Sequence, residues 1–478
     1  MTENRWLACS VFAAVALSLI PNRASAEKIL ANIDGWQVYS DGRAGAFVSW
    51  AHGDGLPPPA TAYIANGDGT FTPVQLQTYV GGGFTGQTTQ GLAIDPNLVG
   101  GQQIYNQGTI DMWRIRSGFV SNILGFGVRG PLTPSTTLTG YMQIWAFVEN
   151  FDRRKAQPNP PDVRIAYAKL EGPWGSVTAG RVRALFSRGA TDIDAMYAHR
   201  WGVGWPGAID NNGPTLGQIG FGVLGNGFSG GIMYATPVLF GLQLTVGAFD
   251  PVQLQGDGGW TRTKYPREEA ELTFERTFRQ GWGKLVLFVN DGYQKVYKGG
   301  YCTPVFIPAT NSNVPCDQTV VGAGYGGRLE LGPFHLGVAG HYGRGLGLGY
   351  ALEVSPAAQD KLGILRKTTG AYVQTMVSIR KADVFAGWGI VQVYMTDYDS
   401  KYTMQDPRDP TNPNAQVLVW GVLKYQMGIN GGVVYNVTPN LHLDLDFFRA
   451  QAGWYGVNGF GEPKQVVYVS NGGMSVNW

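Results

Sequence analysis

The sequence predicts an all-β protein, a single transmembrane antiparallel β-barrel of about 16 strands. Three observations predict this fold. Charged residues make up only 15% of the chain, whereas glycine occurs 70 times and aromatic residues reach 12%, as expected where strand positions alternate between lipid and water. Apolar and polar residues alternate along many successive segments. Tight turns alternate with long loops, which is the asymmetry of outer-membrane barrels.

Residues 1–26 predict a secretory signal peptide. Arg5 supplies a positive charge, residues 6–20 form an apolar run, and Ala24 and Ala26 form a small-x-small cleavage site. Cleavage after Ala26 would leave residues 27–478 as one barrel domain. We therefore expect export to the outer membrane of a Gram-negative bacterium.

Two cysteines, Cys302 and Cys316, follow the signal peptide. In an exported protein they favour one disulfide across a loop, with two free thiols as the alternative. No metal site is expected there, because no further ligands stand nearby. No cofactor is expected either: the Gly-x-Gly-x-x-Gly matches at 125–130 and 202–207 follow from abundant glycine. The formal net charge of +2 argues against a nucleic-acid partner, which needs a basic footprint.

Alternation is clearest in the first expected strand, residues 36–50. Its even positions share a face suited to lipid, with an aromatic residue at each end: Trp36, Val38, Ser40, Gly42, Ala44, Ala46, Val48 and Trp50. Its odd positions suit water: Gln37, Tyr39, Asp41, Arg43, Gly45, Phe47 and Ser49. The small residues on the even face also suit a close contact with another subunit.

Later strands are paired by tight turns, which are "PLTPST", "GPWG", "TPVLFG", "RQGWG", "LGPF", "RKAD" and "NVTPN". Long Gly-, Pro- and Asn-rich segments separate the pairs: 52–108, 151–161, 185–225, 251–265, 298–319, 345–367, 397–416 and 455–464. With an opening and a closing strand, the pairs give about 16 strands, an even number as in bacterial barrels. The last strand ends on Trp478, an aromatic residue suited to closing a barrel at the membrane interface.

The segment "EGPWGSVTAGRVRA" (171–184) places two arginines on one strand face. Arg181 and Arg183 are two residues apart, so they should point the same way. An outward arginine at the bilayer midplane costs about 2–4 kcal/mol. We therefore expect both to face a water-filled lumen.

Three segments, with the terminal aromatic residue, carry a resemblance to the general bacterial porins, which are trimeric diffusion channels. They are "GFGVRG" (125–130), "YMQIWAFVEN" (141–150) and "RIAYAKLEGPWGSVTAGR" (164–181). The resemblance extends over nearly the whole chain after the signal peptide. It implies a homotrimer among outer-membrane lipid and lipopolysaccharide, and a third long loop, 185–225, that folds inward and narrows the channel.

The resemblance also implies that acidic residues on this constriction loop face arginines on the barrel wall. The acidic candidates are Asp192, Asp194 and Asp210, and the wall candidates are Arg43, Arg114, Arg116, Arg181 and Arg183. Arg164 is a weaker candidate because its strand alternates less cleanly. Glu271 and Glu275 are expected to line the lumen away from its narrowest point.

The leading hypothesis is a passive porin that admits small hydrophilic solutes and ions and is not an enzyme. One alternative is a substrate-selective barrel for sugars or anions, in which Tyr197, Trp201 and Trp205 would form an aromatic slide. Another is a barrel hydrolase or an adhesin. A hydrolase would use the cluster of His442, Asp444 and Asp446, which a polar wall ladder also explains.

Overall fold

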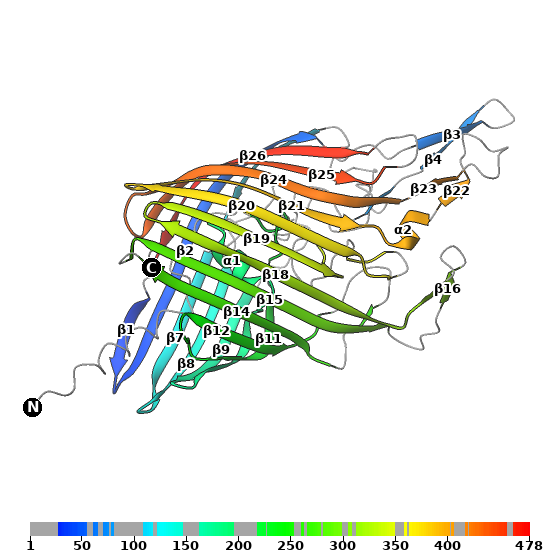
Figure 1. Cartoon of the computed structure of the whole chain (residues 1–478). Helices are drawn as coiled ribbons and strands as arrows, with labels where there is room; N and C mark the ends of the chain where they lie inside the picture. The colour runs from blue at the N-terminus through cyan, green and yellow to red at the C-terminus, as the bar shows by residue number, and fades with distance from the viewer. Residues whose placement is uncertain are drawn as a thin grey trace, which may run out of the picture.

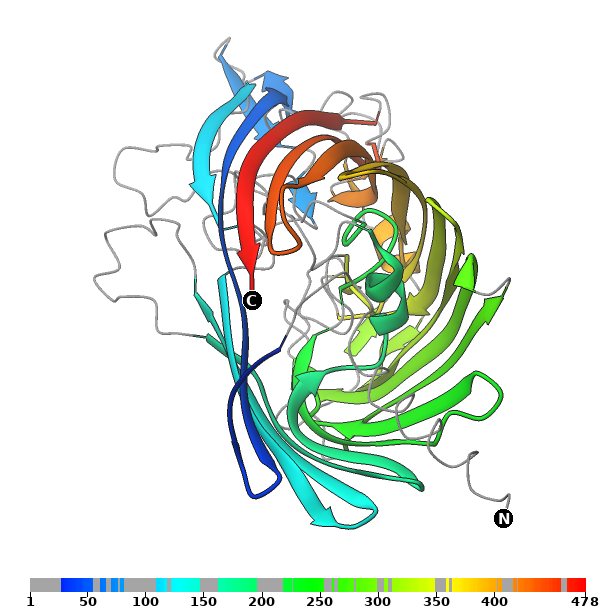
Figure 2. The ribbon, with the colours of Figure 1, turned by 90° about the vertical axis from the view of Figure 1, so that its left-hand side faces the viewer.

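The computed structural model describes most of the chain after residue 26. The described residues are 27–54, 61–65, 70–75, 78–80, 109–117, 122–146, 162–195, 218–225, 227–252, 260–261, 265–278, 281–298, 305–307, 312–348, 358–360, 363–401, 403–405, 416–418, 420–456 and 462–478. They form a closed antiparallel β-barrel of 16 strands (Figures 1 and 2). The predicted fold class is therefore confirmed. The predicted signal peptide lies outside the described residues.

Each strand of the wall pairs with the next along the chain. The wall strands are β2 (Trp36–Asp54), β7 (Asn122–Thr133), β8 (Thr136–Ala146), β9 (Asp162–Gly172), β10 (Gly175–Arg183), β11 (Phe228–Ala235), β12 (Leu242–Phe249), β14 (Arg267–Phe278), β15 (Gly283–Lys298), β18 (Asp317–Leu331), β19 (Phe334–Arg344), β20 (Lys367–Ile379), β21 (Ala382–Tyr394), β24 (Trp420–Asn436), β25 (Leu441–Trp454) and β26 (Lys464–Asn477). Beside β7, β6 (Thr109–Arg116) continues the pairing along β2, and β13 (Trp260–Thr261) extends the sheet beside β15.

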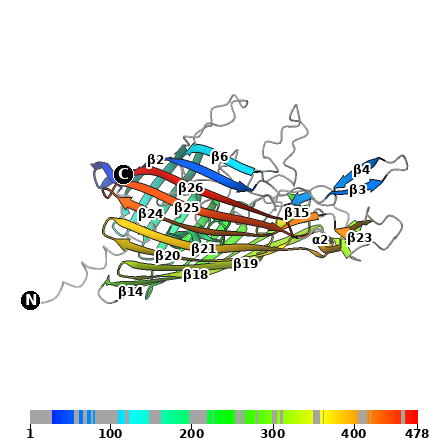
Figure 3. The same ribbon diagram turned by 90° about the horizontal axis from the view of Figure 1, so that it is seen from above.

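The barrel closes where β26 pairs with β2, and Figure 3 shows β25 and β26 beside β2. The Gly42 amide donates to the Trp478 carbonyl oxygen at 2.8 Å, and the Trp478 amide donates to the Gly42 carbonyl oxygen at 3.0 Å. A Cβ atom on Gly42 would lie only 2.3 Å from the Trp478 ring. Glycine at position 42 therefore makes room for the terminal indole at the seam.

The two faces of the wall differ as the alternation predicts. On β2, Val48 and Trp50 are exposed on the outside, whereas Phe47, Ser49 and Ala51 are buried on the inside. Similar alternation recurs along β25, where leucines are exposed and the intervening polar residues are buried. Apolar side chains outside and polar side chains inside are the arrangement of a barrel that spans a membrane.

One end of the barrel carries the tight turns and the other carries the long loops. Figure 1 shows short hairpins beyond the loop end, formed by β3 (Thr61–Ala65) with β4 (Phe71–Gln75), β16 (Val305–Ile307) with β17 (Ser312–Val314), and β22 (Thr403–Gln405) with β23 (Gln416–Leu418). A helix, α2 (Asp397–Lys401), and β5 (Thr78–Val80), which pairs in parallel with β24, complete this end. No helix in the described part of the chain is long and apolar enough to cross a membrane.

An additional N-terminal strand, β1 (Lys28–Ile33), pairs with the start of β2. The sequence analysis missed this strand, although the turn between the two, Asp34–Gly35, is a strong hairpin signal. Both turn residues have positive φ, 52° for Asp34 and 83° for Gly35. Such angles match the right-handed twist of the two strands.

Candidate functional site

The chain enters the barrel directly after β10. It forms a short helix, α1 (Arg188–Ile193), inside the ring of strands, and this helix contacts β15, β18 and β19 (Figure 2). The expected inward fold of the third long loop is therefore confirmed. Of the predicted constriction loop, 185–225, the structure describes residues 185–195 and 218–225.

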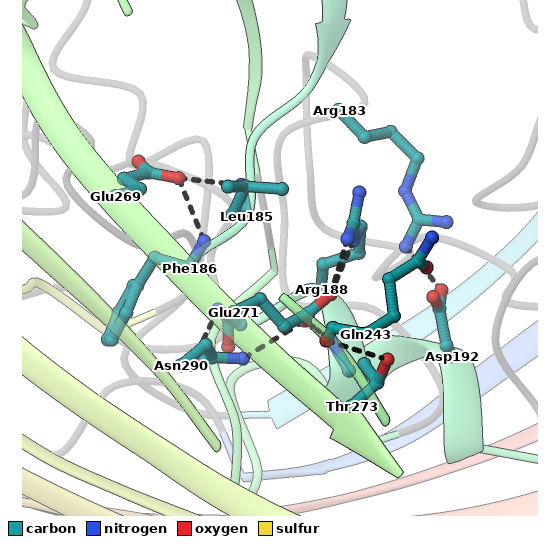
Figure 4. A network of polar contacts seen from close by, with 12 residues as sticks. Arg183, Leu185, Phe186, Arg188, Asp192, Gln243, Glu269, Glu271, Thr273 and Asn290 are labelled. Carbon is teal, nitrogen blue, oxygen red and sulfur yellow. Dashed lines mark hydrogen bonds and ion pairs between the residues drawn. The ribbon is translucent and has the colours of Figure 1, made fainter. Parts of the chain in front are cut away.

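Two buried carboxylates of β14 hold the beginning of this loop (Figure 4). Glu269 Oε2 accepts hydrogen bonds from the backbone amides of Leu185 and Phe186, at 2.6 and 2.8 Å. Glu271 Oε1 accepts from Arg188 Nε at 2.8 Å, and Glu271 Oε2 accepts from the Gly189 amide at 2.9 Å. Burying a carboxylate is costly unless donors surround it, so these hydrogen bonds stabilise both the two glutamates and the position of the loop.

Neighbouring side chains fix the position of α1 further. The Asn290 side-chain oxygen accepts from the Ser187 amide at 3.3 Å, and the Tyr372 hydroxyl donates to the Ala190 carbonyl oxygen at 3.0 Å. A Cβ atom on Gly189 would lie 2.3 Å from the Phe288 ring. The helix can therefore lie this close to β15 only with glycine at position 189.

Glu271 corrects a sequence-based expectation. It was expected to line the lumen away from the narrowest point, but it directly binds the constriction loop. Alternation placed it correctly on the inner face, where it is buried. Alternation carries no information on which inward side chains a distant loop reaches.

The returning part of the loop, residues 218–225, packs against the wall further round the barrel. The Phe221 ring meets the Phe448 ring at 4.7 Å between centroids, and a Cβ atom on Gly389 would collide with the Phe221 carbonyl oxygen. The two ends of the loop are joined where the Gln218 amide donates to Asp194 Oδ2 at 2.8 Å. The described parts of the loop thus follow the wall from β14 to β25.

Two of the predicted charged residues meet at the loop. Arg183 Nη2 lies 2.7 Å from Asp192 Oδ1 and donates to Thr191 Oγ1 at 2.8 Å. Asp194 is buried and accepts the backbone hydrogen bond from Gln218. Asp192 is therefore part of a partly exposed ion pair, whereas Asp194 holds the two ends of the loop together. Asp210 lies outside the described residues.

Arg181 does not join this group, and the expectation that it faces the lumen is wrong. It is exposed, and its neighbour Ala179 pairs across the sheet with the outward-facing Ile232. The inner face of β10 is instead formed by residues such as Val182, which packs against Phe249 in an apolar cluster. Arg183 reaches the lumen because it stands at the strand end, where the chain turns inward.

The other predicted wall arginines lie on or beside β2. Arg43 is buried on the inner face, with its guanidinium carbon 6.0 Å from the Phe47 ring centroid. The backbone of β6 places Arg114 opposite Ser49 and Arg116 opposite Phe47, but these two arginine side chains lie outside the described part of the structure.

Several charges on the described inner face occur as opposite pairs within 3 Å. The pairs are Arg129 with Glu27, Arg164 with Asp162, Lys169 with Glu171, Arg267 with Glu269, and Arg328 with Glu330. Sequence reasoning named only Arg164 among these residues, and alternation alone cannot reveal which charges pair across neighbouring positions. These five pairs add polar groups to the lumen without adding net charge.

The alternative histidine cluster is part of the inner wall. His442, Asp444 and Asp446 are all buried there, and His442 Nδ1 lies 2.7 Å from the side-chain oxygen of Asn436. This arrangement fits a polar wall ladder. Among the described residues, no group of three or more His, Cys, Asp or Glu side chains is placed to hold a metal ion.

Cys316 is disulfide-bonded. Its expected partner, Cys302, lies outside the described residues, so the pairing of Cys302 with Cys316 stays a prediction.

Comparisons with known proteins identify the fold. No protein-family model and no curated protein sequence matches the chain. Among solved structures, the chain is similar to the outer membrane channel DcaP of Acinetobacter baumannii, with 13% identity, a TM-score of 0.56, and coverage of 94% of this chain and 99% of that chain. It is also similar to an anion-selective porin from Comamonas acidovorans, with 12% identity, a TM-score of 0.51, and coverage of 93% and 100%. The shared feature is the complete 16-stranded barrel.

Proposed function

We propose that this chain, which has the barrel fold of outer-membrane porins, is a passive porin of a Gram-negative outer membrane. It forms a water-filled channel through which small hydrophilic solutes and ions diffuse, and no bond is made or broken. The observation that carries the proposal is the clamping of α1 inside the barrel by Glu269 and Glu271. A loop held against one side of a barrel narrows its lumen, which is the arrangement a diffusion channel needs.

The wall opposite the loop supports this function. On β2, β7, β8 and β9 the inner face carries tyrosines, amides and closed ion pairs such as Arg129 with Glu27 and Lys169 with Glu171. Polar groups of this kind replace the hydration of a passing solute, while paired charges avoid holding an ion tightly. Weak binding along a polar wall permits diffusion in both directions.

The experiment is conductance across a planar lipid bilayer containing the purified protein. The proposal predicts stepwise current increases, each linear in voltage and in salt concentration. A protein that inserts, verified by flotation with liposomes, but produces no current steps would overturn it. A current that saturates at low solute concentration would favour a substrate-selective channel for sugars or anions instead.

Ion preference depends on the net charge of the side chains that stand at the inward loop. Arg183 and Asp192 stand beside each other at the loop, so their fields largely cancel. We propose weak ion selectivity for this reason. The zero-current potential across a salt gradient measures this selectivity directly. A value near the Nernst potential of the cation alone or of the anion alone would contradict the proposal.

We further propose that the chain assembles as a homotrimer among outer-membrane lipid and lipopolysaccharide. Support comes from the outer face near Arg181, where Ala168, Ala179 and Gly230 are exposed and small. An arginine that faces lipid is unfavourable, by up to about 2–4 kcal/mol at the bilayer midplane and by less near the interfaces. A second copy of the chain, lying close against these small residues, would cover Arg181 and remove it from lipid.

A further inference from the structure

Three tyrosines form one continuous row on the inner wall. The cross-strand partner of Tyr39 on β2 is Gly127 on β7, the partner of Gly127 is Tyr141 on β8, and the partner of Tyr141 is Tyr167 on β9. Directly paired residues share one face of a sheet. Because the adjacent Val128 is exposed on the outside, the row faces the lumen. It extends across three strand spacings, about 14 Å.

Glycines of β7 allow these rings to lie flat on the wall. A Cβ atom on Gly127 would lie 2.1 Å from Tyr39 Cζ, and one on Gly125 would lie 2.4 Å from the Tyr141 hydroxyl oxygen. The rings of Tyr39 and Tyr141 are nearly parallel, with centroids 6.2 Å apart and an interplanar angle of 13°. The Tyr167 ring follows at 5.6 Å from Tyr141. The glycines of β7 thus leave room for a continuous row of tyrosine rings on the inner wall, which we call the track.

The three rings have different exposures, so they contribute differently. Tyr39 is buried, because one side rests on Gly127 and the Arg129 guanidinium carbon lies 4.9 Å from its ring centroid. Tyr141 and Tyr167 are only half-buried. The surface open to a solute is therefore formed by Tyr141 and Tyr167, with Tyr39 supporting them from beneath.

Hydrogen-bonding groups border the track. The Tyr141 hydroxyl donates to Asp41 Oδ1 at 2.8 Å and accepts from Gln143 Nε2 at 3.1 Å. The hydroxyls of Tyr39 and Tyr167 form no hydrogen bond within the described part of the chain. Because Tyr39 is buried, only the Tyr167 hydroxyl is offered to a solute, as donor and as acceptor.

The cations beside the track are already neutralised. Arg129 Nη1 lies 2.7 Å from Glu27 Oε2, and Lys169 Nζ lies 2.6 Å from Glu171 Oε2. A carboxylate-bearing ring would need one of these cations free. A neutral ring with hydroxyl groups needs none, because its apolar C–H face can lie on the tyrosine rings while its hydroxyls meet Tyr167, Asp41 and Gln143.

We propose that the row Tyr39–Tyr141–Tyr167 is a weak binding track for neutral pyranose sugars, placed on the pore wall that the described constriction loop leaves uncovered. The inference rests on the proposed pore function and names the solute class that this pore favours. The aromatic slide predicted from the sequence, Tyr197, Trp201 and Trp205, lies outside the described residues and is a different set of side chains.

The test measures permeation by liposome swelling with the full-length protein. Glucose, which is cyclic, is compared with sorbitol, its acyclic counterpart of the same carbon number. Wild-type protein should admit glucose faster than sorbitol by about threefold or more, a modest effect as expected for ring stacking. Tyr141→Ala and Tyr167→Ala should each bring the ratio toward one while sorbitol entry and salt conductance persist.

Matched variants separate stacking from folding effects. Tyr325→Ala removes a tyrosine from the outer face and should leave the ratio unchanged. Tyr141→Phe keeps the ring but loses the Asp41 hydrogen bond, so it should keep most of the preference. If Tyr141→Ala fails to insert, Tyr167→Ala alone decides the question.

The outcomes distinguish this inference from the pore itself. A wild-type glucose-to-sorbitol ratio near one, with normal conductance, overturns the sugar track and leaves the pore standing. Stronger block of the current by benzoate than by glucose reassigns the track to aromatic anions and also overturns the inference. Absence of conductance contradicts the proposed function as a whole.

Discussion

Glu271 on the barrel wall and Arg188 on the inward helix are joined by a hydrogen bond of 2.8 Å from Arg188 Nε to Glu271 Oε1. The glutamate is buried, and it accepts a second bond from the Gly189 amide. The two residues are far apart in the sequence, so this contact fixes where the third loop crosses the lumen. It holds the inward helix at a defined place on the wall.

Glu271→Gln should loosen the loop. The neutral amide loses the charge that Arg188 requires, and removing one partner of a buried ion pair costs about 3–5 kcal/mol. Single-channel recording should show a larger and noisier conductance than wild type. Glu275→Gln is the matched control on the same strand, because Glu275 pairs with Lys284 and not with the loop. Equal conductance in all three proteins would contradict the clamp.

Gly189→Ala should displace α1 from β15. The added methyl group would lie 2.3 Å from the Phe288 ring, and overpacking of this kind costs about 1–3 kcal/mol. The midpoint of thermal unfolding should fall and the channel conductance should change. Gly140→Ala is the control, since a Cβ atom there meets nothing within 4 Å. A Gly189→Ala protein identical to wild type in both measurements would show that the helix is not held this tightly.

Asp399→Asn should destabilise the loop end of the barrel. Arg366 Nε lies 2.7 Å from Asp399 Oδ2, with both side chains almost completely buried, so breaking the pair costs about 3–5 kcal/mol. The exposed pair of Lys424 and Glu462 provides the contrast, because Lys424→Ala should cost less than about 1 kcal/mol. Urea unfolding followed by tryptophan fluorescence measures both changes. The reverse ranking would contradict the burial of the first pair.

Arg181→Glu should weaken the proposed trimer. The substitution reverses the charge of Arg181, which lies among the small exposed residues Ala168, Ala179 and Gly230 that we assign to a subunit contact. Electrophoresis without heating should show trimers for wild type and monomers for the variant. Arg380→Glu, at a tight turn between β20 and β21, should leave the trimer intact. If the Arg181→Glu variant stays trimeric, Arg181 does not lie in the subunit interface.

The sequence predicts much of the wall because alternation and turn chemistry are local signals. Every tight turn that was expected joins two observed wall strands. The Asp34–Gly35 turn was equally visible in the sequence. Residues 28–33 before it show no alternation of apolar and polar side chains, so no strand was predicted there.

The sequence predicts the site less well because the site depends on contacts between distant residues. The two arginines of β10 show the difficulty. The cost of an arginine that faces lipid assigned both to the lumen. The register of β10 with β11, however, places Arg181 on the outer face with Ala179. Arg183 contacts Asp192 only because the chain turns inward directly after it. Register across neighbouring strands, which no single segment specifies, decides both outcomes.

The most direct test of the central claim is the size cut-off of the channel. Single-channel conductance is measured in graded polyethylene glycols, which lower the current only if they enter the pore. We predict that Glu269→Gln combined with Glu271→Gln, which releases the loop from β14, admits larger polymers than wild type. An identical cut-off in the two proteins would contradict the claim that the clamped loop sets the bore.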